Sequence, residues 1–178
     1  DGTDHAALNA IAVFLRDDTG QKLQRKSSGV LHTHLYVSGG ESVLEFLRRV
    51  MGRSLDRCYL EVISPYFDKY AKKLPLDELI AAFDPVETRV HLPLDDAGRA
   101  GVSENVYRHV AELPGAYWGQ LPNALLRLGA AADAGNRFVH AKVYRFFKPA
   151  SSAGPRTEVL FVGSVNLTSA AHTGTNNF

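Results

Sequence analysis

The stretch RFVHAKVYRFF, residues 137 to 147, is rich in β-branched and aromatic residues and predicts a strand. Because side chains alternate along a strand, His140, Lys142 and Tyr144 are expected on one face and Val143 on the other. Two residues along a strand cover about 6.5 Å, so an imidazole and an ammonium can converge on a group the size of a phosphate. The same spacing also fits an ordinary solvated strand face, so the neighbouring sequence has to distinguish the two.

A hairpin is expected directly after this strand. KPASSAGPRT (148–157) is rich in turn residues, and EVLFVGS (158–164) again reads as a strand. A helix is then expected within NLTSAAHTG (166–174). The two strands would pair and bring the end of the second beside the start of the first.

That pairing predicts one cluster of polar groups. Gly163 allows close approach of the backbone, and Ser164 and Asn166 carry short polar side chains near the expected start of a helix. Free amides at a helix start favour an anion. Beside His140 and Lys142, these groups would suit the charge of an anionic phosphorus transition state.

Helix and strand patterns alternate through the preceding sequence. Residues 114–136 are predicted as a loop with at least one helical turn, and no internal repeat is present. The other predicted elements are two or three strands within 13–37, a helix over 38–52 with a capping box of Ser38 and Glu41, a strand over 58–67, a helix over 75–83, a strand over 88–94 and a helix over 103–113. This order predicts an α/β fold, a mixed β-sheet flanked by helices on both faces.

Composition excludes several classes of protein. The chain has 178 residues, 45% hydrophobic and 22% charged, with a formal net charge of +1. These values fit a globular protein and not a disordered, fibrous or coiled-coil chain. The single cysteine, Cys58, is expected in the core; it excludes an intrachain disulfide and suits the cytoplasm. No apolar run approaches the roughly 20 residues of a membrane span. Since the first residue is Asp1, we expect a piece of a longer protein.

The two motifs His140-Ala-Lys142 and Gly163-Ser-Val-Asn166, joined by a hairpin, resemble the signature of the phospholipase D superfamily of phosphodiesterases. CYLEVISPYFD resembles the early core strand and loop of that family, and NLTSAAHTGTNNF resembles the helix after the signature. The resemblance spans residues 42–178.

The resemblance implies a phospholipase D-like domain over residues 41–178, with a fold like one half of the family's nucleases. Residues 1–40 would form N-terminal strands, which could be the tail of an upstream half. Three features depart from the family. Phe147 stands where the family often has an aspartate, the hairpin is longer than in compact members, and the chain stops before a common glutamate.

The resemblance also implies a mechanism without metal or cofactor. His140 would attack the phosphorus of a phosphodiester and form a covalent phosphohistidine, and a second histidine would protonate the leaving oxygen. Lys142, Ser164 and Asn166 would hold the non-bridging oxygens. Gly163 and Tyr66 would lie against the substrate, although core packing is an equal role for Tyr66.

Only one complete copy of the His-x-Lys motif occurs, whereas family active sites combine two. LHTHLY (31–36) resembles a degenerate copy in which His34 replaces the lysine. The second half would come from a homodimer partner or from the rest of a longer chain. If there is none, the domain is a non-catalytic or half-site module that binds nucleic acid or a partner protein.

Basic residues favour nucleic acid over phospholipid as the substrate, and no amphipathic membrane helix stands out. They would equally suit a solvated surface, and chance motifs on a carbohydrate-binding or small-molecule-binding α/β domain are a further alternative. The basic residues are Lys22, Arg25, Lys26, Arg137, Lys142, Arg145 and Lys148.

Other candidates have weaker patterns. His32 and His34 would share a strand face and could bind a metal, but no third ligand has a recognisable spacing. His172 could face the site, but a solvent-facing role is the expected one. Tyr117 and Trp118 could stack on a base or a lipid chain, but packing under a loop is the expected role.

Overall fold

The computed structural model describes residues 32, 34–36, 40–70, 73–95, 97–122, 126, 139–151, 154 and 156–173. The chain divides into two compact units, Asp1–Tyr36 and Val37–Phe178, and all elements below belong to the second. Most of the strands predicted before residue 38, together with Lys22, Arg25 and Lys26, lie outside the described residues. Among the helices described, none is long and apolar enough to cross a membrane.

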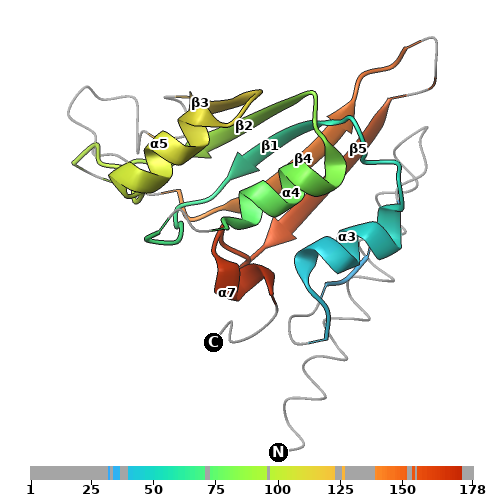
Figure 1. Ribbon diagram of the computed structural model, residues 1–178, viewed down its shortest axis with the longest axis horizontal. Helices are drawn as coiled ribbons and strands as arrows, with labels where there is room; N and C mark the ends of the chain where they lie inside the picture. Colours follow the sequence, from blue (N-terminus) through green and yellow to red (C-terminus); the bar gives the residue numbers. More distant parts are fainter. Residues whose placement is uncertain are drawn as a thin grey trace, which may run out of the picture. The chain divides into compact units, whose positions relative to one another are not determined.

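The second unit contains a five-stranded mixed sheet with the strand order β3-β2-β1-β4-β5 (Figure 1). β1, β2 and β3 run parallel, and β4 runs antiparallel to both β1 and β5. The strands are β1 (Tyr59–Ile63), β2 (Glu87–Leu92), β3 (Ala116–Gln120), β4 (Lys142–Lys148) and β5 (Thr157–Gly163). The predicted mixed α/β fold is therefore confirmed.

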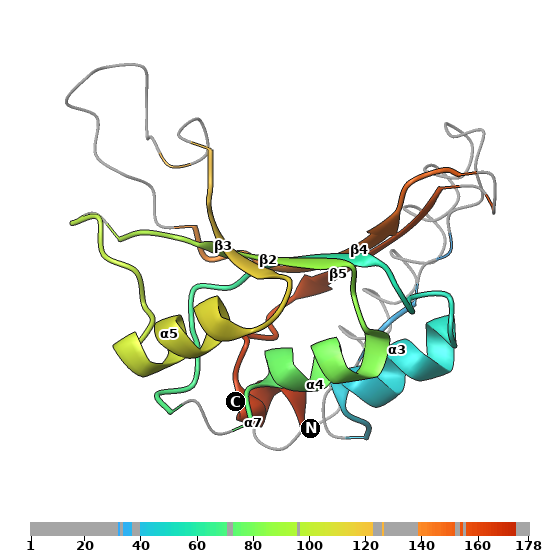
Figure 2. The same ribbon diagram turned by 45° about the horizontal axis from the view of Figure 1, so that its top comes forward.

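The described helices lie on one side of this sheet (Figure 2). They are α3 (Val43–Met51), α4 (Pro75–Phe83), α5 (Glu104–Glu112) and α7 (Ser169–His172). The chain moves across the sheet in one direction, from β1 through α4 to β2 and through α5 to β3. Crossovers of the same hand then place both helices on the same face. Of the two helix layers predicted, the described helices form one.

The core fills the space between the sheet and these helices. Leu60, Val62 and Phe146 point from β1 and β4 into this layer and are at most 1% exposed. The rings of Phe83 and Phe146 meet edge to face at 5.5 Å between centroids and join α4 to β4. Each such side chain contributes roughly 1.5–3 kcal/mol by burial. Cys58 is 1% exposed, as predicted for a core residue.

The start of α3 differs from the prediction. Ser42 caps the helix, its hydroxyl accepts from the amide of Glu45 at 3.2 Å, and the Glu45 carboxylate accepts from the amide of Ser42 at 2.8 Å. The capping box predicted from Ser38 and Glu41 is therefore wrong by one turn. Both serines precede a glutamate by three residues, and the apolar face of α3, which begins at Val43, selects the second.

β3 was not predicted, because residues 114–136 read as a loop. Ala116–Gln120 pairs with β2 as a parallel edge strand, Val90 opposite Trp118. The segment contains Gly119 and no run of alternating apolar residues, so its local pattern is weak. The backbone hydrogen bonds to β2 therefore stabilise β3 although its own residues have a weak preference for a strand.

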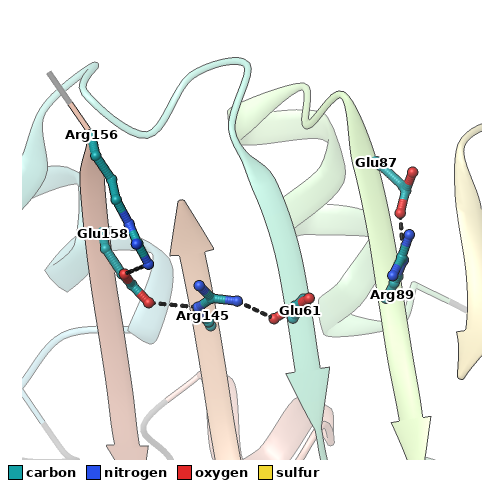
Figure 3. Close-up of polar contacts among 6 residues, drawn as sticks. All are labelled: Glu61, Glu87, Arg89, Arg145, Arg156 and Glu158. Carbon is teal, nitrogen blue, oxygen red and sulfur yellow. Dashed lines mark hydrogen bonds and ion pairs between the residues drawn. The ribbon is translucent and has the colours of Figure 1, made fainter. Parts of the chain in front are cut away.

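The face of the sheet opposite the described helices carries paired charges (Figure 3). Arg145 donates to Glu61 at 2.7 Å and to Glu158 at 2.6 Å, which links β4 to both of its neighbours. These hydrogen bonds raise the pKa of Arg145, Glu61 contributing most. Arg145 was predicted to add positive charge for a phosphate backbone, but two carboxylates already compensate it on the face opposite Lys142.

Candidate functional site

The candidate site lies at one edge of the sheet, where five strand ends meet. The parallel strands β1, β2 and β3 end there at Ile63, Leu92 and Gln120, β4 begins there at Lys142, and β5 ends there at Gly163. Carboxyl ends of parallel strands are the usual place for ligands in open α/β sheets. The sheet therefore delivers the two predicted motifs to a position suited to binding.

Lys142 and His140 are in direct contact. The Lys142 ammonium lies 2.8 Å from both ring nitrogens of His140 and 3.2 Å from the His140 carbonyl oxygen. The prediction placed both residues within one strand. β4 begins only at Lys142, so His140 precedes the strand and is exposed, while Lys142 and Tyr144 share the buried face.

Lys142 is a buried cation. Only 4% of the residue is exposed, and burial lowers the pKa of its ammonium. In the part of the chain that the structure describes, no carboxylate forms an ion pair with it. A buried charge without a counter-ion is costly, and its cost falls when an anion arrives. The ammonium is thus arranged to receive a negatively charged group.

Gly163 stands directly opposite Lys142 in the β4–β5 pairing, as the two motifs predicted. A Cβ placed on Gly163 would meet no atom within 4 Å. Packing therefore does not require a glycine here. The backbone at Gly163 is exposed, so a ligand can approach it on the strand next to Lys142.

Ser164 and Asn166 follow Gly163 as predicted, but not at a helix start. Helix α7 begins at Ser169, three residues after Asn166, and spans only four residues. Ser164 is exposed, and Oδ1 of Asn166 is buried without a hydrogen-bond partner in the described structure. The predicted contribution of free helix amides is therefore wrong. The side chains remain as the polar groups of this segment.

Tyr144 and His172 lie in the core next to the segment of Ser164–Asn166. The hydroxyl of Tyr144 donates to the carbonyl oxygen of Val165 at 3.2 Å and lies 2.8 Å from Nε2 of His172. Since the hydroxyl has one hydrogen, Nε2 of His172 donates to it. His172 is only 5% exposed, and this burial lowers its pKa to about 4. The expectation that His172 faces solvent is wrong, because α7 turns it into the core.

Two further residues organise the site and were not singled out from the sequence. The hydroxyl of Ser64 donates to the carbonyl oxygen of Tyr66 at 2.9 Å and accepts from the amide of Leu167 at 3.0 Å. Asp68 accepts from the amide and hydroxyl of Ser169 at 2.8 and 2.7 Å. A polar residue at the end of a buried strand, before Pro65, is the signal that could have identified Ser64.

Tyr66 lies beside the two central groups. Its ring meets the His140 ring edge to face at 5.6 Å, and the Lys142 ammonium lies 5.9 Å from its centroid. Tyr66 is 44% exposed. The structure thus places this predicted substrate contact at the site and not in the core.

His32, His34 and Trp118 are the weaker candidates from the sequence. His32 and His34 are exposed, and no group of three or more metal-ligating side chains occurs in the described part of the chain. Trp118 stacks on Tyr107 at 5.1 Å between ring centroids. A pocket of about 640 Å³ lies at the opposite edge of the sheet, lined by residues that include Arg48, Arg53, Arg57 and Asp84.

Comparison with protein-family models, curated proteins and solved structures gives no match for this chain. The site's chemistry therefore has to be judged from its own residues.

Proposed function

We propose that this domain is a phosphodiesterase of the phospholipase D superfamily, in which His140 is the nucleophile. The single observation that carries the proposal is the contact between His140 and the buried Lys142 ammonium, 2.8 Å apart, where no carboxylate of the described residues forms an ion pair with the lysine. A nucleophile held beside an unneutralised cation suits an anionic electrophile such as a phosphodiester. The basic residues of the sequence make nucleic acid the expected substrate.

In the first step, a ring nitrogen of His140 forms a bond to phosphorus while the bond from phosphorus to the leaving oxygen breaks. An acid, a second histidine in the resembling family, gives the leaving oxygen a proton. Water then attacks the phosphohistidine, the P–N bond breaks, and the same second histidine takes the proton from the water. The enzyme returns to its starting state with one water consumed.

The surrounding residues have separate roles in this proposal. Lys142 moves from the imidazole to the non-bridging oxygens, and Ser164 and Asn166 donate hydrogen bonds to them. These contacts strengthen as charge builds up on the five-coordinate phosphorus, so they act on kcat more than on binding. Open space opposite Lys142, at Gly163, admits the phosphate.

The source of the second histidine decides between an enzyme and a half-site module. A second copy of the chain is one source, and the rest of a longer chain is the other. If a second copy supplies it, turnover per chain falls on dilution, in step with the loss of dimer measured by light scattering. If neither supplies it, the domain binds its ligand without turnover.

The test is hydrolysis of bis(p-nitrophenyl) phosphate with a metal chelator present. We expect His140→Ala to reduce turnover to background, and Lys142→Ala to lower kcat by about 10²–10³-fold, as for the loss of one transition-state donor. Lys148→Ala is the matched control, because it removes a positive charge at the far end of β4, and it should stay within twofold. Alkaline-stable phosphate on His140, seen by mass spectrometry, would identify the intermediate.

Two results would contradict the enzyme proposal. Turnover that persists in His140→Ala would remove His140 as nucleophile. A wild-type domain inert at every concentration would instead favour the half-site module that binds nucleic acid or a partner.

A further inference from the structure

Tyr66 presents an exposed aromatic ring next to the groups that would hold the phosphate. It is 44% exposed, although its ring lies 5.6 Å from the His140 ring and 5.9 Å from the Lys142 ammonium. A phosphate oxygen bound to Lys142 would lie about 3 Å from the ammonium. The chemical group next to that phosphate therefore comes within reach of the Tyr66 ring.

The backbone of the loop that carries Tyr66 is anchored to the segment after β5. The hydroxyl of Ser64 donates to the carbonyl oxygen of Tyr66 at 2.9 Å, and Ser64 is fully buried. The same hydroxyl binds the amide of Leu167, so the Tyr66 loop and the segment after β5 share one anchor. A bridge between Phe67 and Leu167 adds a second tie. The backbone that carries the ring is thus held next to the phosphate position before any ligand binds.

The chemistry around Tyr66 suits a planar ring and not an acyl chain. His140, Ser164 and Lys69 are exposed at or near this edge, and all three are polar. An acyl chain needs a continuous apolar surface, whereas a nucleobase needs one flat face with polar groups beside it. The exposed aliphatic residues Leu160 and Val162 belong to β5 and alternate with Phe161, which points into the core.

We propose that Tyr66 stacks on a base next to the bound phosphate, and that single-stranded nucleic acid is the ligand class of this site. The inference rests on the proposed function for the position of the phosphate, but base stacking needs no turnover. It therefore can be tested by binding alone. Phospholipid headgroups share the phosphate but offer no planar ring.

The experiment compares binding of a labelled thymidine hexamer with an abasic hexamer of equal phosphate number, by fluorescence anisotropy. We expect wild type to bind the thymidine hexamer about 5- to 100-fold more tightly, the range for one base on an aromatic side chain. Tyr66→Ala should bind the two within threefold of each other. Tyr66→Phe should keep the preference, because the ring and not the hydroxyl stacks.

Tyr117→Ala is the matched control. Tyr117 is 57% exposed and is the second residue of β3, opposite Arg89 and away from the carboxyl edge, which lies at Gln120. It should keep the wild-type preference. The inference is overturned if Tyr66→Ala keeps the preference for bases, if wild type has none, or if wild type binds phosphatidylcholine vesicles and neither hexamer.

Cleavage of the thymidine hexamer, followed separately on a gel, reports on the proposed function. Base preference that depends on Tyr66 without any cleavage would support the stacking role and contradict the phosphodiesterase. Cleavage with equal binding of both hexamers would support the enzyme and contradict the stacking role.

Discussion

The phenolic oxygen of Tyr144 lies 2.8 Å from Nε2 of His172, directly beneath the segment that carries Ser164 and Asn166. Tyr144 is 0% exposed and stands two residues after Lys142 on the same face of β4. Through the carbonyl of Val165, its hydroxyl holds the peptide between the two polar residues of the second motif. The buried strand and the candidate site are thus joined by one hydroxyl group.

Removal of this hydroxyl should weaken the fold and the site together. Tyr144→Phe leaves the Val165 carbonyl and Nε2 of His172 without their partner, and we expect a loss of about 1–3 kcal/mol in the free energy of unfolding. Urea unfolding measures it. Tyr117→Phe, at an exposed tyrosine, should change stability by less than about 0.5 kcal/mol. Equal effects of the two changes would show that the buried hydroxyl contributes nothing.

Acid should destabilise the protein through His172. Its pKa is about 4 in the folded state, because it is buried, against about 6.5 when unfolded. Between these values the unfolded chain binds more protons, so stability falls as the pH drops from 6.5 to 4, by about 3 kcal/mol from this residue. His172→Gln keeps a donor to Tyr144 but does not titrate. Urea unfolding at both pH values should show a smaller fall for the variant, and an identical fall would contradict the assignment.

The Lys142 ammonium should favour anion binding but not the stability of the fold. Lys142→Met keeps most of the length of the side chain but removes a charge that no carboxylate of the described residues pairs with, and we expect the free energy of unfolding to stay level or rise. Anion binding should be lost, which thermal shift on addition of inorganic phosphate can detect. A variant that is less stable than wild type would mean that the ammonium is compensated within the fold.

Arg145 tests the alternation of faces along β4. It lies three residues after Lys142 and bridges Glu61 and Glu158 on the face opposite the described helices. Arg145→Ala should cost about 1 kcal/mol or less, as expected of a partly exposed ion-pair network, and leave phosphate binding within twofold of wild type. A large loss of phosphate binding would place Arg145 in the site and contradict the face assignment.

Two glycines should respond differently to alanine. A Cβ on Gly101 would lie 2.7 Å from the carbonyl oxygen of Pro65, a backbone atom beside Tyr66. A Cβ on Gly119 would lie 2.7 Å from Nδ1 of His91, a side chain that can turn. We expect Gly101→Ala to cost about 1–3 kcal/mol by unfolding and Gly119→Ala clearly less. The reverse order would show that the Pro65 loop adjusts more easily than His91 does.

Local sequence patterns sufficed for much of this fold. The patterns of 137–147 and 158–164 predict two strands, which the structure has at 142–148 and 157–163, and their order predicts the hairpin that sets Lys142 opposite Gly163. The spacing of Val43, Phe46 and Leu47 predicts α3, and Gly52 ends it. In each case the apolar residues recur in the sequence with the period at which side chains of that element are buried, so the local pattern is enough to predict the element.

The parts that sequence could not supply depend on partners distant in the chain. β3 exists because Ala116–Gln120 pairs with β2, and its own residues specify little. His172 is buried by a helix of four residues, which is too short to show a period. Ser64 gains its role from Leu167, 103 residues away. Such contacts become visible only when the chain has folded.

The bridge made by Ser64 has a consequence for how the site opens. One buried hydroxyl binds the turn after β1 and the connection after β5, so neither can detach without releasing the other. The two turns should therefore exchange their amide hydrogens with deuterium as a single cooperative unit, even though they lie at opposite ends of the domain's sequence. A single serine hydroxyl in this way makes two segments that are distant in sequence open as one unit.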